Sequence, residues 1–359
     1  MKKILYVNAN NSSFSNLDQQ ILNKYFKVST FYIKQKKSKI LLLFGFISLL
    51  FFILFNSFRA KAMITWFADY HSALMVFIGR ILGIKVVIFT GGMEAICYPE
   101  LKKGAYYKKF RSRFVKFALR NADLIIPNHK SLLYHENFYY SPEGKKDGIL
   151  YYNPGIKTKF VILPNGIDTE KFFRDESINK NNRMLLTIGT MHSVYDFINK
   201  GFDLFIELAK RNPQFEFVLI GIKKQFLPWI EEKFQINKIK NLNVILFCEN
   251  YRILFEYYNQ SKVFVQASIT EGLPNTLIEA MLCECIPVGS NVNGIPDAIG
   301  DTGIIVKKRN IDLMEKAVYQ AFNLNSGGMA RKHILKHFSL DIREEKLLRI
   351  LAENGLVPS

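Results

Sequence analysis

The strongest constraint on the fold is an alternation of short apolar runs with longer helical stretches that extends along the whole chain. Short apolar strands separated by helices are typical of parallel sheets that helices cover on both faces. The alternation occurs in two runs, and the length of 359 residues also favours two domains. We therefore expect an α/β protein with two doubly wound domains. Its expected strands are 4–7, 26–32, 63–67, 85–89 and 124–127 in the first run, and 185–189, 215–220, 244–247, 263–267, 286–289 and 303–306 in the second.

Two polar segments without periodicity, residues 141–159 and 175–183, indicate where the domains meet. We assign residues 1–165 to an N-terminal domain and residues 166–340 to a C-terminal domain. The last helix, about 340–359, is a candidate to pack back on the first domain. Ligands of open α/β sheets bind outside the carboxyl ends of the strands, so two such domains facing each other would enclose a binding cleft.

The charge is unevenly divided between the two halves. Residues 1–160 contain 25 Lys and Arg against 8 Asp and Glu, whereas residues 161–359 contain 24 against 23. A positive surface confined to one half indicates an anionic partner, either nucleic acid or the head groups of a membrane. The chain has no RNP-like aromatic strand, zinc knuckle or C2H2 spacing, so we expect no nucleic acid partner. The four cysteines form neither a zinc motif nor a disulfide framework, and a reducing cytoplasm suits them.

The apolar pattern favours a membrane. Residues 40–55 contain no charged side chain. They follow a cluster of lysines at Lys34, Lys36, Lys37 and Lys39. The run is slightly shorter than the ~20 residues of a spanning helix, and a single crossing would separate the first strand from all later ones. We expect residues 40–58 to lie in, or dip into, one leaflet; the alternative is a helix buried between the two domains.

A second segment, residues 102–120, contains eight basic side chains and no acid. Its aromatic residues recur at helical spacing and share one face: Tyr107, Phe110, Phe114 and Phe117. Such a helix suits the surface of an anionic membrane. A surface helix whose aromatic residues pack on the core explains the spacing equally well. We expect peripheral or monotopic association with the cytoplasmic face of the cell membrane.

Residues 268–297 contain the densest chemical signal. After an expected strand, Glu271 and Gly272 lead into a helix that begins near Asn275. The free backbone N–H groups of a helix N-terminus form an anion site, and glycine lets the backbone approach a phosphate closely. Glu271 and Glu279 would repel a phosphate unless they accept hydrogen bonds from hydroxyls, so sugar and ribose hydroxyls are their natural partners. A capping Glu271 and a solvated Glu279 are the weaker alternative.

This segment, EGLPNTLIEAM, resembles the E-x(7)-E signature of retaining nucleotide-sugar glycosyltransferases with the GT-B fold, the bacterial family-four group. Other landmarks of that family occur in the expected order: GGMEAICYPEL at 91–101, RNADLIIPNHKSLL at 120–133, PNGIDTEKF at 164–172 and LLTIGTMHSVYDFINKGFDLFIELAK at 185–210. The resemblance covers most of the chain. It implies two Rossmann-like domains facing each other across a cleft, with the acceptor in the first and the nucleotide-sugar in the second.

The resemblance also implies roles for single residues. Glu279 would bind ribose hydroxyls, Glu271 would contact the donor sugar, and Lys200 would bind the phosphates. The diphosphate would lie against the backbone of Gly189, Thr190, Gly272, Leu273, Asn275 and Thr276. Gly92 belongs to the acceptor-domain loop that faces the donor. Many family members have Arg where this chain has Thr190, so Lys200 and the helix N-terminus suffice, or another cation substitutes, or activity is compromised. The loop 190–199 is also long and is a candidate to shape donor choice.

The chain has no D-x-D motif, so we expect no metal and no cofactor besides the donor, which is linked to UDP or GDP. Lys200 and the helix dipole would stabilise the leaving group. Asp69 and His71 follow an expected strand and are candidates to orient acceptor or donor, with a purely structural histidine as the alternative.

The expected function is transfer of one sugar from a nucleotide-sugar to a lipid-linked or membrane-bound glycan acceptor, with retention of configuration, in cell-surface polysaccharide synthesis. A nucleotide-sugar 2-epimerase of the same fold is the enzymatic alternative, although the membrane-directed segments would serve no purpose there. An inactive membrane scaffold is the third possibility, favoured only by Thr190. The oligomeric state stays open.

Overall fold

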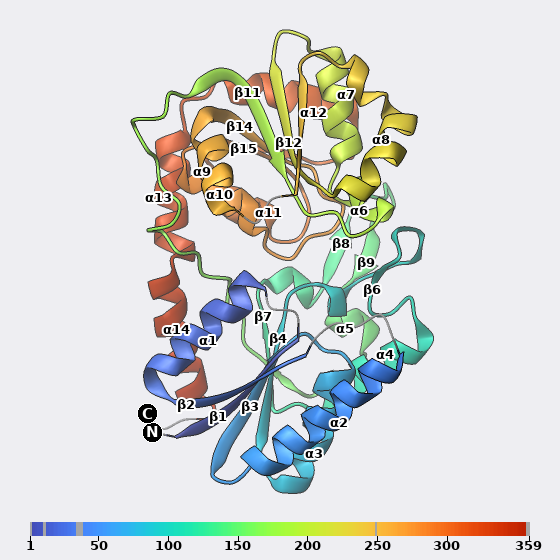
Figure 1. Cartoon of the computed structure of the whole chain (residues 1–359), viewed down its shortest axis with the longest axis vertical. Helices are drawn as coiled ribbons and strands as arrows, with labels where there is room; N and C mark the ends of the chain where they lie inside the picture. Colours follow the sequence, from blue (N-terminus) through green and yellow to red (C-terminus); the bar gives the residue numbers. More distant parts are fainter. Residues whose placement is uncertain (1, 10–11, 34–38, 248–249, 357–359) are drawn as a thin grey trace. The chain divides into compact units, whose positions relative to one another are not determined.

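The structure is a computed structural model that describes residues 2–9, 12–33, 39–247 and 250–356 (Figure 1). The described residues form two compact units. Unit 1 comes from residues 1–135, 147–166 and 340–359, and unit 2 comes from residues 136–146 and 167–339. The chain therefore returns to unit 1 after unit 2 is complete.

In unit 1 the described residues form a parallel sheet with the strand order β10-β7-β4-β3-β1-β2. All five strands that the sequence predicts here are present, and the two-residue β10 is an addition. The strands are β1 Lys3–Asn8, β2 Lys27–Tyr32, β3 Ala60–Trp66, β4 Lys85–Thr90, β7 Leu124–Pro127 and β10 Lys159–Phe160. One short pair accompanies them, β5 Cys97–Tyr98 with β6 Lys103–Gly104. A second short pair, β8 His135–Asn137 with β9 Lys145–Asp147, lies almost wholly in unit 2. The helices are α1 Ser13–Tyr25, α2 Lys39–Asn56, α3 Tyr70–Leu82, α4 Lys109–Asn121, α5 Ile149–Tyr152 and α14 Leu340–Glu353.

A buried ion pair fixes the last helix to unit 1. Arg343 of α14 donates from Nε and Nη2 to the two carboxylate oxygens of Asp18 in α1, at 2.6 and 2.7 Å. Asp18 also accepts from Trp66 Nε1 at 2.9 Å, and Arg343 Nη1 donates to the carbonyl oxygens of Leu163 and Pro164. Arg343 and Asp18 are 3% and 0% exposed. Such a buried pair is tolerated because each partner has its hydrogen bonds satisfied.

In unit 2 the described residues form a second parallel sheet with the order β13-β12-β11-β14-β15-β16. All six strands predicted for this part are present. They are β11 Asn181–Ile188, β12 Glu216–Ile222, β13 Leu242–Leu246, β14 Ser261–Gln266, β15 Ile286–Ser290 and β16 Ile304–Val306. The helices are α6 Val194–Asn199, α7 Phe202–Arg211, α8 Leu227–Phe234, α9 Tyr251–Gln260, α10 Asn275–Leu282, α11 Ile295–Ile299, α12 Ile311–Phe322 and α13 Gly327–Phe338.

A hairpin from the first half of the sequence belongs to unit 2. Asn137 Nδ2 donates to the carbonyl oxygen of Ile269 at 2.8 Å, and Arg309 N donates to the carbonyl oxygen of Tyr139 at 2.9 Å. Asn137 and Tyr139 are 0% and 2% exposed. The polar composition of residues 141–159 gave no sign of this packing.

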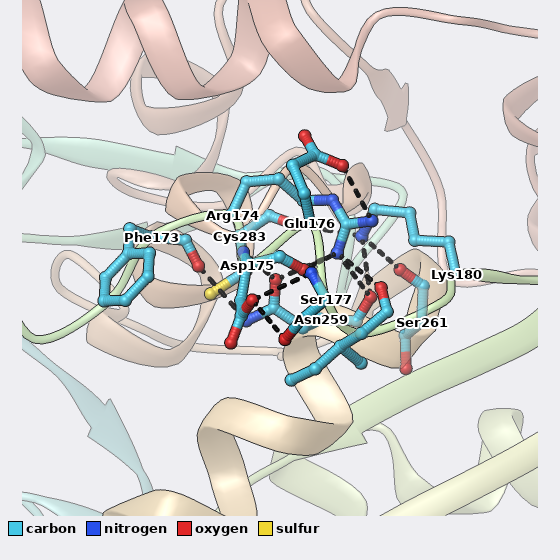
Figure 2. A network of polar contacts seen from close by, with 10 residues as sticks. Phe173, Arg174, Asp175, Glu176, Ser177, Lys180, Asn259, Ser261 and Cys283 are labelled. Atoms are coloured by element: carbon cyan, nitrogen blue, oxygen red, sulfur yellow. Dashed lines mark hydrogen bonds and ion pairs between the residues drawn. The ribbon is translucent and has the colours of Figure 1, made fainter.

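Basic side chains order the polar segment that precedes β11 (Figure 2). Arg174 Nη1 donates to Asn259 Oδ1 at 3.2 Å, and Lys180 Nζ donates to the carbonyl oxygens of Ser261 and Cys283, each at 2.9 Å. Ser261 begins β14, and Cys283 ends α10. The segment therefore ties the start of a central strand to the end of α10, the helix that contains Glu279.

On unit 1, α2 packs on α3, and α3 packs on α4. The core side of α4 consists of Val115, Ala118 and Leu119, whereas Phe110 and Phe117 are 64% and 37% exposed. Two of the four aromatic residues of this stripe are therefore exposed, whereas Phe114 packs against Tyr70 of α3 with ring centroids 5.0 Å apart.

The apolar helix α2 is buried on one side only. Leu49 and Ile53 are fully buried, whereas Leu43, Phe51 and Phe55 are 60%, 52% and 80% exposed. Its other side presents large apolar side chains. Among the described residues, no helix combines the length and the apolar character that crossing a bilayer requires. The lysines at Lys34, Lys36 and Lys37 lie outside the described residues.

Candidate active site

The predicted donor residues lie at the carboxyl edge of the unit 2 sheet. The strands β11 and β14 are parallel neighbours, so the loops that follow them meet at the same edge. Lys200 comes after β11 and α6, and Glu271 lies in the loop after β14. Lys200 Nζ and Glu271 Oε2 are 2.6 Å apart, with 22% and 21% of their side chains exposed. The structure thus joins two residues that lie far apart in the sequence.

Asn199 and Gly201 hold the turn that presents Lys200. Asn199 is 1% exposed, and its Oδ1 accepts a hydrogen bond from Thr270 Oγ1 at 3.0 Å. Thr270 is the residue directly before Glu271. Gly201 has a φ of +74°, and a Cβ there would lie 2.4 Å from the Ala267 carbonyl oxygen. Only glycine permits this approach to the end of β14. The Lys200 turn and the Glu271 loop are therefore fixed against each other by backbone and buried polar contacts.

The loop that begins at Glu271 is held by the loop after β15. Glu271 N donates to Asn293 Oδ1 at 3.3 Å, and Gly294 N donates to the Gly272 carbonyl oxygen at 2.9 Å. Gly272 and Leu273 are both buried. The loop backbone is therefore fixed before α10 begins.

The N-terminus of α10 follows directly. Pro274 is its N-cap residue and makes no side-chain capping bond. Thr276 Oγ1 donates to Gln266 Oε1 at 3.3 Å, which anchors the first turn to the end of β14. The backbone N–H groups near Asn275 and Thr276 are those that a helix leaves without intrahelical partners, and they suit an anionic ligand.

Glu279 lies in the second turn of α10 and has one oxygen engaged. Tyr258 donates its hydroxyl to Glu279 Oε2 at 2.8 Å, and Tyr258 is fully buried. Burial raises the pKa of Glu279, while the Tyr258 hydrogen bond and the charge of Lys171 lower it. The buried phenol of Tyr258 therefore orients this carboxylate through Oε2.

The loop after β11 is shorter than the sequence indicates. Gly189 N donates to the Ile220 carbonyl oxygen at 3.0 Å. The residues from Val194 onward form α6, whose start is capped by Ser193 and Asp196. The prediction of a long loop over 190–199 is wrong, because a six-residue helix is too short to show an apolar period.

Lys223 is a cation near this loop that sequence reasoning did not identify. It follows β12, the other neighbour of β11, and its Nζ lies 3.1 Å from His192 Nδ1. Thr190, two residues before His192, occupies the position where an Arg was expected. Lys223 is therefore a candidate for the substituting cation.

In unit 1, His71 and Asp69 lie at the start of α3. Asp69 caps the helix and accepts from Arg111 Nε at 3.1 Å and Nη2 at 2.6 Å. His71 is 6% exposed, with Nε2 3.1 Å from both Thr65 Oγ1 and the Trp66 carbonyl oxygen. Burial lowers the pKa of His71, against the opposing effect of Asp69. These contacts hold the imidazole against the end of β3.

The glycine-rich loop after β4 contains a buried acid that sequence reasoning missed. Gly92, with a φ of +135°, precedes the short helix that contains Glu94. Glu94 is 1% exposed, and its Oε1 accepts from Gly91 N at 3.2 Å. Its Oε2 is buried and has no hydrogen-bond partner among the described residues. Burial raises the pKa of Glu94 to about 7, although Arg111 and the loop N–H groups lower it.

Comparison with known proteins adds a family to this geometry. Residues 168–334 match the family described as glycosyl transferases group 1. The match covers slightly less than half of the chain. It includes Lys200, Glu271 and Glu279, together with every other predicted donor residue of unit 2.

Curated relatives match between about half and two thirds of the chain. The N-acetylgalactosamine-N,N'-diacetylbacillosaminyl-diphospho-undecaprenol 4-alpha-N-acetylgalactosaminyltransferase of Campylobacter jejuni is 28% identical over 241 residues, which cover 64% of this chain and 58% of the relative. One component of the human phosphatidylinositol N-acetylglucosaminyltransferase is 25% identical over 179 residues, which cover 47% of this chain and 34% of the relative. The matches thus span between about a third and three fifths of these relatives' own length.

Solved structures match nearly the whole chain. Sucrose-phosphate synthase from Thermosynechococcus elongatus has a TM-score of 0.74 at 13% identity and covers 98% of this chain and 99% of its own. Anabaena HepE in complex with UDP-glucose has a TM-score of 0.72 at 13% identity, with 98% and 99% covered. The chain therefore has the GT-B fold with two Rossmann-like domains, and the predicted fold class is confirmed.

The sequence did not indicate two residues that support the predicted donor site. Asn199 and Tyr258 are polar residues whose importance comes from burial, and no motif spacing marks them. In the part of the chain that the structure describes, no three His, Cys, Asp or Glu side chains cluster so that they could hold a metal ion.

Proposed function

We propose that this chain transfers a sugar from a nucleotide-sugar donor to a lipid-linked or membrane-bound glycan acceptor. The Lys200–Glu271 pair just before α10 carries the proposal, because it puts a cation for phosphates next to a carboxylate for hydroxyls. The group 1 match over 168–334 and the UDP-glucose complex of the HepE neighbour support a nucleotide-sugar as donor.

The donor would bind by replacing contacts that the site makes with itself. Lys200 would exchange the Glu271 carboxylate for the diphosphate, and the first turn of α10 would offer its N–H groups to the same oxygens. Glu271, once released, would accept from hydroxyls of the sugar. Glu279 would accept from ribose hydroxyls through Oε1 while Tyr258 holds Oε2.

In the transfer step, the bond between the anomeric carbon and the phosphate oxygen breaks and its electron pair goes to the diphosphate. Lys200 and the α10 dipole would stabilise this negative charge without a metal. We propose retention of configuration, with a leaving phosphate oxygen taking the proton of the acceptor hydroxyl on the same face of the sugar. No protein nucleophile is needed for this route.

The acceptor side rests on unit 1. The C. jejuni relative is named for a diphospho-undecaprenol acceptor, and unit 1 of this chain exposes large apolar side chains on α2 beside the basic helix α4. We therefore propose peripheral association with the cytoplasmic face of the membrane, where a lipid carries the glycan.

Thermal unfolding with UDP, GDP and their sugars tests the donor half of this proposal. The correct nucleotide should stabilise the protein by about 2.7 kcal/mol at a hundred times its Kd. The stabilisation and the transfer to lipid-linked glycan should survive EDTA. An absolute requirement for Mg²⁺ or Mn²⁺ contradicts the metal-free leaving-group site, and no stabilisation by any nucleotide contradicts the site itself.

A further inference from the structure

The helical surface of unit 1 formed by α2, α3 and α4 contains an apolar groove that the donor site does not use. It has a volume of about 720 Å³ and lies where α2, α3 and α4 meet. Eight of its nine lining residues are apolar or aromatic, and the ninth is Arg113. The volume falls within the ~300 to 1,000 Å³ typical of pockets for small ligands.

Aromatic rings form the wall of the groove. The ring centroids of Tyr70 and Phe114 are 5.0 Å apart, those of Phe110 and Phe114 are 5.1 Å apart, and those of Phe46 and Tyr70 are 6.3 Å apart. The rings are tilted or edge-on to one another, so they support each other and keep the hollow open. Phe77 of α3 also lines it and is 53% exposed. Apolar hollows hold water poorly, which favours an apolar occupant.

The surroundings of the groove limit what this occupant can be. Exposed apolar side chains of α2 lie beside it, and α4 contains basic side chains and no acid. Lys109 and Arg113 are four residues apart in α4, so they share one helix face. A second copy of this chain would bring one basic helix against another. An elongated hydrocarbon with a negative head group satisfies both the apolar wall and the basic edge.

We propose that this groove binds the hydrocarbon chain of a phosphate-bearing lipid, with Arg113 and Lys109 at the lipid phosphate. The inference rests on the proposed transfer to a lipid-borne glycan and adds the part of the acceptor that unit 1 recognises. The lipid is held by a defined site, in addition to any adsorption of the exposed α2 face to a bilayer. The groove then selects acceptors that have both a hydrocarbon chain and a phosphate.

Calorimetric titration with farnesyl phosphate below its critical micelle concentration tests this site, with farnesol and inorganic phosphate as the chain-only and phosphate-only probes. We expect saturable binding of farnesyl phosphate at one equivalent and much weaker binding of either partial probe. Binding without saturation, or equal binding of farnesol, overturns the proposal.

The lead variant is Phe77→Asp, which puts a carboxylate into the groove at an exposed position. Ile81→Asp is the matched control, because Ile81 lies one turn further along α3, is 64% exposed and does not line the groove. Phe77→Asp should weaken farnesyl phosphate binding about tenfold or more, since an unpaired carboxylate is costly in an apolar site. Ile81→Asp should bind like the unmodified protein. Equal affinity of the two variants overturns the assignment.

Two further measurements on the same samples keep the outcomes distinct. Stabilisation by the nucleoside diphosphate shows that each variant is folded. If the nucleotide does not stabilise the unmodified protein either, the donor site is contradicted, while the lipid titration can still be interpreted. Sedimentation across a concentration series tests the competing occupant. A dimer that Phe77→Asp dissociates would show that a second copy covers the groove, which contradicts the lipid proposal.

Discussion

The two units leave different kinds of surface open. At the strand ends of unit 2, charged groups have partners from the same unit, as Lys200 has in Glu271 and Glu279 has in Tyr258. On the surface of unit 1 formed by α2 and α4, Phe55 and Phe110 are 80% and 64% exposed. A polar site can rest with its charges paired internally, because a ligand can displace those partners later. Exposed apolar side chains that lie together have no such internal pairing, and they mark a surface that suits a partner.

The largest expected effect comes from the exposed side of α2. Replacing Phe51, Leu54 and Phe55 together with Ser should reduce binding to anionic vesicles at least about a hundredfold, since burying one such side chain contributes up to about 1.5–3 kcal/mol. Vesicle sedimentation at low salt measures it. Ser replacements at Leu313, Tyr319 and Met329, which are exposed apolar residues of unit 2, are the control. Equal losses in both triple variants would erase the difference between the faces.

The polar side of the comparison depends on Lys200 and Glu279. Changing either to Ala should weaken binding of the preferred nucleoside diphosphate about ten- to a hundredfold, because hydrogen bonds to charged groups contribute about 1.5–3 kcal/mol. Isothermal titration calorimetry measures the change. Lys210→Ala, at an exposed position of α7, removes the same charge away from the site. Unchanged affinity in both site variants would show that neither Lys200 nor Glu279 binds the nucleotide.

Unit 1 also contains a charged group at a strand end, Glu94, but this acid is buried and its Oε2 has no hydrogen-bond partner among the described residues. Its pKa is raised from 4.5 to about 7, so the folded state binds more protons than the unfolded state between these values. The free energy of unfolding should therefore fall as pH rises from about 4.5 to 7, at most by about 1.4 kcal/mol per pH unit. Denaturant titrations should show this slope reduced in Glu94→Gln. An identical slope in both proteins would contradict the assignment.

The smallest effect concerns charge on α4. Neutralising Lys109 and Arg113 to Gln should cost about 1 kcal/mol per residue in binding to anionic vesicles at low salt, and screening should remove most of the difference at high salt. Lys332 and Lys336 of α13 have the same four-residue spacing and serve as the control pair in unit 2. A salt-independent loss would mean that the two residues act through packing.

The strands of both sheets follow from the sequence because each is a short apolar run between polar stretches. The elements that escaped prediction are those whose stability comes from distant contacts. The hairpin at 136–146 depends on Asn137 reaching Ile269, and α6 depends on the Ser193 and Asp196 cap. Neither relies on a period that a local window of sequence contains.

The candidate site divides in the same way. Lys200, Glu271 and Glu279 could be named in advance because their spacing and neighbours form a motif, and the structure pairs the first two directly. Glu94 could not be named, because a glutamate in a glycine-rich loop looks solvated until the fold buries it. The groove among α2, α3 and α4 could not be foreseen either, since it needs three helices whose order in space the sequence does not state.

The ion pair between Asp18 and Arg343 has a consequence for the order of synthesis. A growing chain completes all the strands of the first sheet, and then the whole of unit 2, before the residue that neutralises Asp18 has been made. Until then a carboxylate destined for the interior must stay solvated, which keeps α1 from settling on β3. Unit 1 is therefore begun before unit 2 and finished after it.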